Sequence, residues 1–433
     1  MAIDSAQSSA ASVSAVDTST PARELRLTAL LGPGLIVAAA GIGSGDVVSA
    51  TVGGATYGVT LLWAIALGAF FKFVLTEGIA RWQLATGLTL LEGWATYLPA
   101  WVKVYFGLYL VLWTFAVTAA LTNATGLGIA NLTGGAIPQS WGAVAHSFIG
   151  AAFVLVGGFA GFDKAIKILV GVMGFSVLTC AALTFTSPVE TLSGLVPTIP
   201  QGAGVYVLSL VGGIGGSITM LGYSYWMREE KIAGPGCLKY VRGDLSVAYV
   251  FTALFGMAVM LISHRAFFLS GTQLSDAQAV SRMAQMLGSI LGPFGFWAYA
   301  VGFWACVFAS LLGVWQSVPY LYADFYGAVK KASDEERRRL TQVSSLPYRL
   351  ALLFVTLAPL PFAFMGRPLF IIVTYTVIGS LFIPFLAATL LYMNSRVRWG
   401  ATVPHNHWTT NALLVVILLL FVFVGAREVI GAF

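Results

Sequence analysis

Two hydrophobic segments of this chain are interrupted by glycine near their middles, at corresponding places in its two halves. The first reads AAAGIGSGDVV, from Ala38 to Val48, and the second reads LVGGIGGSITMLGY, from Leu210 to Tyr223. Glycine removes side-chain cover from a helix and lets the backbone unwind. Inside a membrane, unwound backbone is tolerated only where protein surrounds it or where it lines a cavity. The matched breaks therefore predict a binding site shared by the two segments.

The composition places these segments in a lipid bilayer. Of the 433 residues, 58% are hydrophobic and only 9% are charged, whereas a soluble domain carries about 25% charged residues. About 20 apolar residues in a helix cross the hydrocarbon core. We therefore expect an all-α integral membrane protein with eleven transmembrane helices, at roughly 29–52, 55–81, 101–130, 139–162, 165–186, 203–227, 243–270, 285–322, 347–364, 368–394 and 409–431.

The distribution of basic residues predicts the orientation. With the N-terminus in the cytoplasm, eighteen of the 23 Lys and Arg residues fall in cytoplasmic segments and four fall outside, as the positive-inside rule requires. Residues 1–22 are rich in Ser, Ala and Thr and predict a disordered cytoplasmic tail. The C-terminus is then expected outside, with the protein in the bacterial inner (plasma) membrane.

The first five and the next five predicted helices can be superimposed, each set beginning with a glycine-broken helix. Five is an odd number, so the second set enters the membrane from the opposite side. We expect a first five-helix repeat at 23–190, a second at 191–400, and an accessory eleventh helix at 401–433. Such inverted repeats are typical of secondary carriers that work by alternating access.

The first break supplies the one carboxylate of its span, Asp46. A charge near mid-membrane is costly, so it usually serves transport or is paired. Asp46 could hold a cation together with the Ser44 hydroxyl and the backbone at Gly43 and Ala40. It could equally cap the resumed half-helix, since Asp is favoured there, and the two roles are compatible.

The second break offers neutral groups. Met220 is either a soft metal ligand or a packing residue. Ser217 and Thr219 either face a cavity or satisfy carbonyls freed by the break. Tyr223 could gate the site or donate a hydrogen bond within it.

Other polar residues lie inside the predicted spans. Asn123 and Gln316 could line a path, although hydrogen bonding between helices is the simpler interpretation. Glu77 and Arg81 have the i,i+4 spacing of a local ion pair. Lys72 either snorkels or joins that pair.

Several function classes are excluded or disfavoured. GIGSG and GGIGG superficially resemble nucleotide-binding loops, but those loops follow a strand in a βαβ unit, which this chain lacks. No nucleophile–base arrangement stands out, so we expect no enzyme and no cofactor. The net charge of +6 is accounted for by membrane topology, so no nucleic-acid partner is expected. The expected partners are the lipid bilayer and a small ion or solute; the sequence does not indicate an oligomeric state.

The segment from Gly32 to Gly58 resembles the start of the Nramp family of divalent-metal transporters, and the resemblance extends through the eleven predicted spans. It implies the leucine-transporter fold, with metal bound between the unwound parts of spans one and six. The family's Asp-Pro-Gly-Asn motif is replaced here by Gly43-Ser44-Gly45-Asp46. Its Met-Pro-His motif is replaced by Met220-Leu221-Gly222, so the methionine carries over and the histidine does not.

We therefore expect a secondary-active carrier of a divalent metal cation such as magnesium or manganese, with weak or absent proton coupling. Asp46 would supply charge, and Ser44, Met220 and the carbonyls near Ala40 and Ser217 would complete the shell. The alternative is a carrier of a small organic solute such as an amino acid on the same fold. A non-transporting receptor is disfavoured by the small loops.

Overall fold

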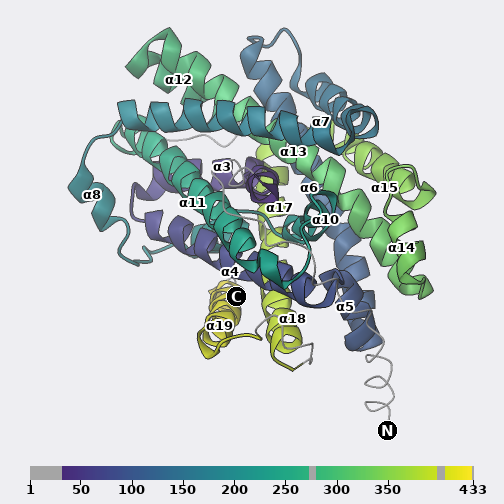
Figure 1. The fold of residues 1–433 in the computed structure, drawn as a ribbon. Helices are drawn as coiled ribbons and strands as arrows, with labels where there is room; N and C mark the ends of the chain where they lie inside the picture. Colours follow the sequence, from purple (N-terminus) through teal and green to yellow (C-terminus); the bar gives the residue numbers. More distant parts are fainter. Residues whose placement is uncertain (1–31, 273–278, 397–404, 432–433) are drawn as a thin grey trace.

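Helices form all the regular structure of residues 32–272, 279–396 and 405–431, which are the residues that the computed structural model describes (Figure 1). The predicted tail at 1–22 lies outside the described residues. Outward-facing positions of the long helices carry exposed apolar side chains, including Leu108, Val156 and Phe175. Such a surface belongs in lipid, because water-facing surfaces rarely carry apolar patches of this extent.

The helices have the following bounds. The first half of the chain contains α2 (Pro33–Gly41), α3 (Ser44–Tyr57), α4 (Leu62–Thr86), α5 (Leu90–Tyr97), α6 (Ala100–Leu132), α7 (Gln139–Leu183) and α8 (Pro188–Ser193). The second half contains α9 (Gly204–Gly213), η2 (Ile218–Leu221), α10 (Gly222–Glu229), η3 (Pro235–Cys237), α11 (Leu238–Ser263), η4 (His264–Phe268), α12 (Ala279–Leu291), α13 (Pro293–Lys330), α14 (Asp334–Leu340), α15 (Leu346–Leu357), α16 (Leu360–Ala363), α17 (Pro368–Ser380), α18 (Phe382–Arg396) and α19 (Trp408–Gly431).

Both predicted helix breaks are confirmed. The first span is divided into α2 and α3, whose axes differ by 56°, and Gly43 between them is extended. The sixth span is divided into α9 and α10, with η2 between them. Gly215 and Gly216 have φ angles of 80° and 88°, a region that residues with a side chain rarely adopt. These glycines therefore permit the second break.

The predicted count of eleven spans is not confirmed. In the described part of the chain, eight helices are long and apolar enough to cross a bilayer, or nine when α2 and α3 count as one broken span. The predicted spans 139–162 and 165–186 both lie in α7, in which two helices meet at a kink at Gly158, with φ 57° and ψ 179°. The two expected helices are therefore present, but the boundary between them lies at Gly158 rather than at 163–164.

Two further predicted spans are divided. The range 285–322 covers the end of α12 and most of α13, because Gly292 has a φ of 70° and Pro293 starts a new helix. The range 368–394 is divided between α17 and α18 at Leu381. The predicted span 409–431 corresponds to α19, an apolar helix of 24 residues.

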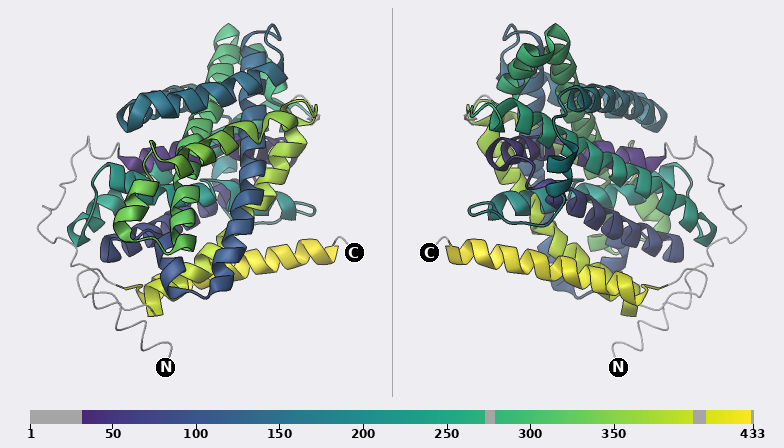
Figure 2. Two further views of the ribbon diagram at one scale, coloured as in Figure 1. Left: turned by 90° about the vertical axis from the view of Figure 1, so that its right-hand side faces the viewer. Right: turned by 90° about the vertical axis from the view of Figure 1, so that its left-hand side faces the viewer.

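The helices that carry the breaks lie at the centre of the bundle. Figure 1 shows α3 and α17 between α7 on one side and α4 on the other. α3 contacts α9, α11 and α17, while α9 contacts α4 and α17. Figure 2 shows α19 as a straight helix along one side of the bundle, where it contacts α18, α9 and α4. This arrangement buries both breaks and places them against each other.

Candidate substrate site at the two helix breaks

Asp46 lies in the first turn of α3 and is 5% exposed. Its Oδ2 accepts a hydrogen bond of 3.0 Å from the Gly43 amide, so it caps the resumed half-helix. The Gly215 backbone, from the second break, also interacts favourably with this carboxylate. The capping interpretation is therefore correct, and the carboxylate also links the two breaks.

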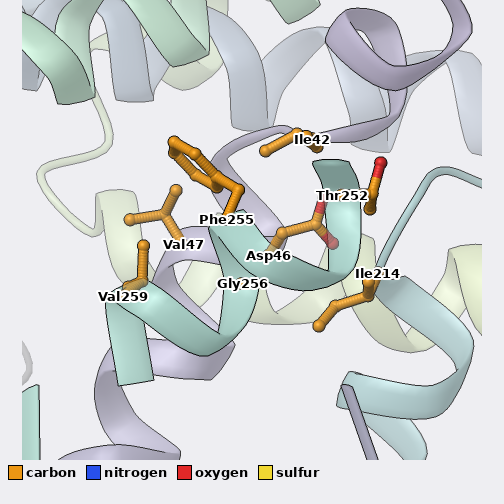
Figure 3. Close-up of a pocket in the computed structure, with 8 residues that line it drawn as sticks. All are labelled: Ile42, Asp46, Val47, Ile214, Thr252, Phe255, Gly256 and Val259. Atoms are coloured by element: carbon orange, nitrogen blue, oxygen red, sulfur yellow. The ribbon is translucent and has the colours of Figure 1, made fainter. Parts of the chain in front are cut away.

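Asp46 also lines two narrow spaces. The first lies against α11 and is lined by Ile42, Asp46, Val47, Ile214, Thr252, Phe255, Gly256 and Val259. Figure 3 shows the Asp46 carboxylate turned toward Thr252 and Ile214, with the apolar side chains on its other side. The second, somewhat larger, lies against α17 and is lined by Gly41, Gly43, Gly45, Asp46, Gly212, Gly213, Ser217, Tyr375, Thr376 and Gly379. Asp46 is shared by the two linings.

Most of the glycines here permit close packing rather than open space. A Cβ added at Gly41 would lie 2.6 Å from the Gly215 carbonyl carbon, so the two breaks touch backbone to backbone. A Cβ at Gly45 would lie 2.4 Å from the Thr376 side chain. At Gly213 the nearest atom is Asp46 Oδ1, at 3.8 Å. Gly213 is thus the glycine that leaves room beside the carboxylate.

A buried lysine occupies the second break. Lys72, on α4, has no exposed surface. Its Nζ donates hydrogen bonds to the Gly212 carbonyl at 2.6 Å and the Ile214 carbonyl at 3.1 Å, and its charge interacts with that of Asp46. The expectation that Lys72 snorkels or joins the Glu77–Arg81 pair is therefore wrong. That pair itself is confirmed, with 2.9 Å between Arg81 and Glu77.

The carbonyls at the first break are satisfied differently. Ser310 Oγ donates to the Ala40 carbonyl at 2.9 Å, and Cys306 Sγ donates to the Ile42 carbonyl at 3.3 Å, both from α13. Helix C-termini leave carbonyls without partners inside the helix. Hydroxyl and thiol side chains supply those partners at the first break, whereas the Lys72 Nζ supplies them at the second.

The predicted residues of the second break separate into two groups. Ser217 lines the larger space, and its Oγ accepts a hydrogen bond of 2.8 Å from Trp113. Thr219 and Met220 lie in η2, buried, and neither belongs to the lining of the two spaces. The hydroxyls of Thr219 and Ser44 are buried without a hydrogen-bond partner among the described residues.

Tyr223 faces a different carboxylate. Its hydroxyl donates to Asp244 Oδ2 of α11 at 2.9 Å, and the same oxygen accepts the Gly34 amide at 2.7 Å. Asp244 thus caps the start of α2, which leaves amides unpaired as every helix start does. Tyr223 therefore supports the first half-helix from α10.

Asn123 and Gln316 make hydrogen bonds between and within helices. Asn123 donates to the Ala119 carbonyl at 2.8 Å and accepts from Gln139 at 2.7 Å. Gln316 accepts from Trp226 at 2.5 Å. The simpler of the two interpretations of these residues fits the contacts.

Three residues of this region were not predicted: Lys72 as a neighbour of Asp46, and Tyr375 and Thr376 of α17. A lone lysine in an apolar span was a visible signal, because such a charge is costly unless it is paired. Tyr375 and Thr376 gave no such signal, since hydroxyl side chains are common in membrane helices.

The chemistry of this region is that of oxygen donors around one acid. The described residues contain no cluster of three or more His, Cys, Asp or Glu side chains. A cation bound here would rely on Asp46, the Ser217 and Thr376 hydroxyls, and backbone carbonyls. Carboxylate, hydroxyl and carbonyl oxygens suit hard cations.

Curated relatives of similar sequence include transporters of divalent metals. The chain is 26% identical over 281 residues to the divalent metal cation transporter MntH of Mesorhizobium japonicum, covering 62% of this chain and 61% of that protein. It is 26% identical over 325 residues to MntH of Aeromonas hydrophila, covering 69% and 75%. An uncharacterised protein of Pasteurella multocida is 24% identical over 305 residues, covering 66% and 68%.

Solved structures of similar fold include a manganese transporter of Eremococcus coleocola, with a TM-score of 0.70, 16% identity, and coverage of 94% of this chain and 89% of that chain. The structure of MhsT in complex with L-phenylalanine matches with a TM-score of 0.58, 17% identity, and coverage of 91% and 98%. These likenesses establish the leucine-transporter-like fold. Residues 34–430 match the family described as natural resistance-associated macrophage protein-like, and the chain therefore belongs to the Nramp family.

Proposed function

We propose that this protein is a secondary carrier that moves a divalent metal cation across the bacterial inner membrane by alternating access. The observation that carries the proposal is the position of Asp46, a buried carboxylate held where two broken helices meet. Membership of the Nramp family and the MntH relatives support it. Members of the Nramp family are transporters and not enzymes, so the site is proposed to bind and release the metal ion.

The proposed ligands are oxygen atoms. Asp46 supplies the charge, and Ser217 supplies a hydroxyl from the opposite break. Backbone oxygens near Ala40 and Gly43 complete the shell, together with retained water where the ion is magnesium. Met220 joins this shell only if η2 turns toward the space, so an oxygen-preferring ion such as manganese or magnesium is favoured over softer metals.

The proposed mechanism requires no proton-coupling histidine. The family resemblance implies that Gly222 takes the place of that residue, and we propose weak or absent proton coupling. The N-terminus is proposed to be cytoplasmic, with inverted repeats at 23–190 and 191–400 and an accessory helix at 401–433. The repeats rock around the Asp46 site and expose it to each side in turn.

The test is uptake into proteoliposomes. Manganese, magnesium, calcium and zinc are each offered with and without a proton gradient. Asp46→Ala should abolish saturable uptake of the transported ion, while Asp163→Asn should not, because Asp163 pairs with Lys167 on α7, away from the breaks. Equal uptake by Asp46→Ala and the wild type would refute the role of Asp46.

A second candidate is a carrier of a small zwitterion such as an amino acid. The favouring observation is that the space beside Asp46 is lined by glycine backbone and by hydroxyl side chains. Asp46 would meet the ammonium of a zwitterion there, and backbone groups of the breaks would meet its carboxylate. Amino acids included in the same uptake panel decide between the candidates, since saturable amino-acid uptake without metal uptake would favour the second.

A further inference from the structure

We propose that Lys72 is a tethered cation, whose ammonium fills a cation site at the second break while the transport site holds no cargo. The site consists of the Gly212 and Ile214 carbonyls at the end of α9. The inference deepens the proposed function and depends on it only for the identity of the cargo. Lys72 would then affect two quantities: the affinity of the site for cargo, and the rate at which the carrier without cargo changes back to its starting conformation.

The carbonyl arrangement at the end of α9 selects a cation. The Ile214 amide bonds the Leu210 carbonyl at 3.3 Å, and the Gly216 amide bonds the Gly213 carbonyl at 3.2 Å. The carbonyls of Gly212 and Ile214 are met by Lys72. The C-terminal end of a helix carries partial negative charge, so two convergent carbonyls there form a favourable place for a positive group.

The position of the lysine is fixed by packing as well as by hydrogen bonds. Lys72 is fully buried on α4, and its Cγ lies 3.3 Å from where a Cβ on Gly215 would stand. An ammonium buried this deeply is stable only with good partners. The two carbonyls provide the hydrogen bonds, and Asp46 provides the opposing charge.

Charge balance gives the tethered cation its role. Without cargo, the negative charge of Asp46 and the positive charge of Lys72 cancel within the closed site. A divalent cation at Asp46 adds two positive charges beside the ammonium and is repelled by it. Lys72 therefore weakens cargo binding, while it keeps the empty site neutral and its carbonyls satisfied during the return step.

The decisive experiment removes the tether and offers soluble cations instead. Lys72→Ala and wild-type protein are purified, and their thermal unfolding is compared in sodium chloride, ethylammonium chloride and choline chloride at equal ionic strength. We expect sodium or ethylammonium, but not the bulky choline, to raise the Tm of Lys72→Ala by about 2 °C or more. The wild type, whose site is filled, should respond equally to all three salts. Lys103→Ala, a lysine on α6, is the matched control.

Every outcome of this experiment bears on the proposal. If Lys72→Ala gives monodisperse protein only in sodium or ethylammonium, the cation site is supported by the folding yield. If it behaves like the wild type in all three salts, or fails to fold in all three, the proposal is wrong. Because no divalent metal is used, this result is independent of whether the protein carries one.

Transport kinetics then test the role of the tether. In proteoliposomes, Lys72→Met should lower the KM for manganese and lower the kcat of net uptake, because cargo binds more tightly and the empty carrier returns slowly. Manganese–manganese exchange, which needs no empty return, should be retained. A raised KM with unchanged kcat would contradict the role, whereas absent wild-type uptake of every divalent ion would instead refute the proposed function.

Discussion

At the scale of single residues, the neighbouring glycines Gly212 and Gly213 of α9 have different structural roles. A Cβ on Gly212 would stand 2.7 Å from Ser380 Cβ and 2.9 Å from the Phe421 ring, so this position must stay bare for α17 and α19 to pack. A Cβ on Gly213 would make only ordinary contacts and would project toward Asp46. One glycine therefore serves packing, and the next serves the space beside the carboxylate.

This difference predicts opposite behaviour for two adjacent substitutions. Gly212→Ala should destabilise the protein by about 1–3 kcal/mol, as overpacking does. Gly213→Ala should leave stability within about 0.5 kcal/mol but raise the KM for cargo several-fold, because its methyl group narrows the space beside Asp46. Thermal unfolding and uptake of the two variants check this. Equal stability of both, or an unchanged KM for Gly213→Ala, would contradict the interpretation.

A second residue-scale prediction concerns Tyr223, which the sequence suggested as a site residue. Its hydroxyl bonds Asp244, so Tyr223→Phe should cost about 1 kcal/mol of stability through one lost hydrogen bond. The KM for cargo should not change, because Tyr223 does not line either space beside Asp46. Tyr375→Phe, at the lining of the larger space, is the comparison. If Tyr223→Phe raises the KM for cargo more than Tyr375→Phe does, Tyr223 takes part in substrate binding and this interpretation is wrong.

At the scale of elements, the sequence predicts the positions of the two helix breaks better than it predicts the boundaries between consecutive helices. Gly43 and Gly215 stand in glycine-rich stretches of apolar segments, and such stretches predict unwinding. Gly158 also stands in an apolar segment, and two helices meet at it within α7, whereas we expected that boundary at 163–164. The hydrogen-bond partners of Lys72 could not be predicted from the sequence either. The helices α4 and α9 are distant in the chain and contact each other only in the folded bundle.

The half-helix α10 is held from several elements by one carboxylate. Asp324 of α13 accepts hydrogen bonds from Thr89 at 2.8 Å, Tyr225 at 2.7 Å and Arg337 at 3.0 Å. Its partners lie at the start of α5, on α10 and on α14. Nearby, Arg228 at the end of α10 bonds Glu92 of α5 at 2.8 Å. This network joins α10 to α5, α13 and α14 on one face of the bundle.

Weakening that network should open the same face. Asp324→Asn removes the charge that faces buried Arg337, and we expect a lower Tm together with faster modification of Cys306 by a small thiol reagent, read by mass spectrometry. Cys306 is a native reporter, since its sulfur lies against the first break at Ile42. Asp334→Asn, exposed on α14, is the control. An unchanged modification rate in Asp324→Asn would show that the network stabilises without gating.

At the scale of the whole molecule, the site is closed by different chemistry on its different sides. The Asp324 network is ionic and joins four elements, as described above. A cluster of hydroxyls joins α3, α9 and α17: Ser49 and Ser209 lie 2.6 Å apart, and Ser209 donates to Thr376 at 3.3 Å. A carrier that works by alternating access must open one closure while the other holds. Hydrogen bonds between hydroxyls are weaker than the charged contacts of the Asp324 network. The contact of α3, α9 and α17 should therefore separate more easily than the contacts around Asp324.

The hydroxyl cluster therefore offers a place to lock the molecule. The hydroxyls of Ser209 and Thr376 lie 3.3 Å apart, so cysteines at these two positions would be neighbours that an oxidant can be used to cross-link. Oxidised Ser209→Cys/Thr376→Cys protein should lose net uptake and exchange alike, since α9 and α17 can no longer separate beside Asp46, and reductant should restore both. Each single cysteine variant controls for the three buried native cysteines. Full transport by protein whose disulfide is verified by mass spectrometry would show that α9 and α17 do not separate during transport. The two repeats would then have to move relative to each other at a different helix contact.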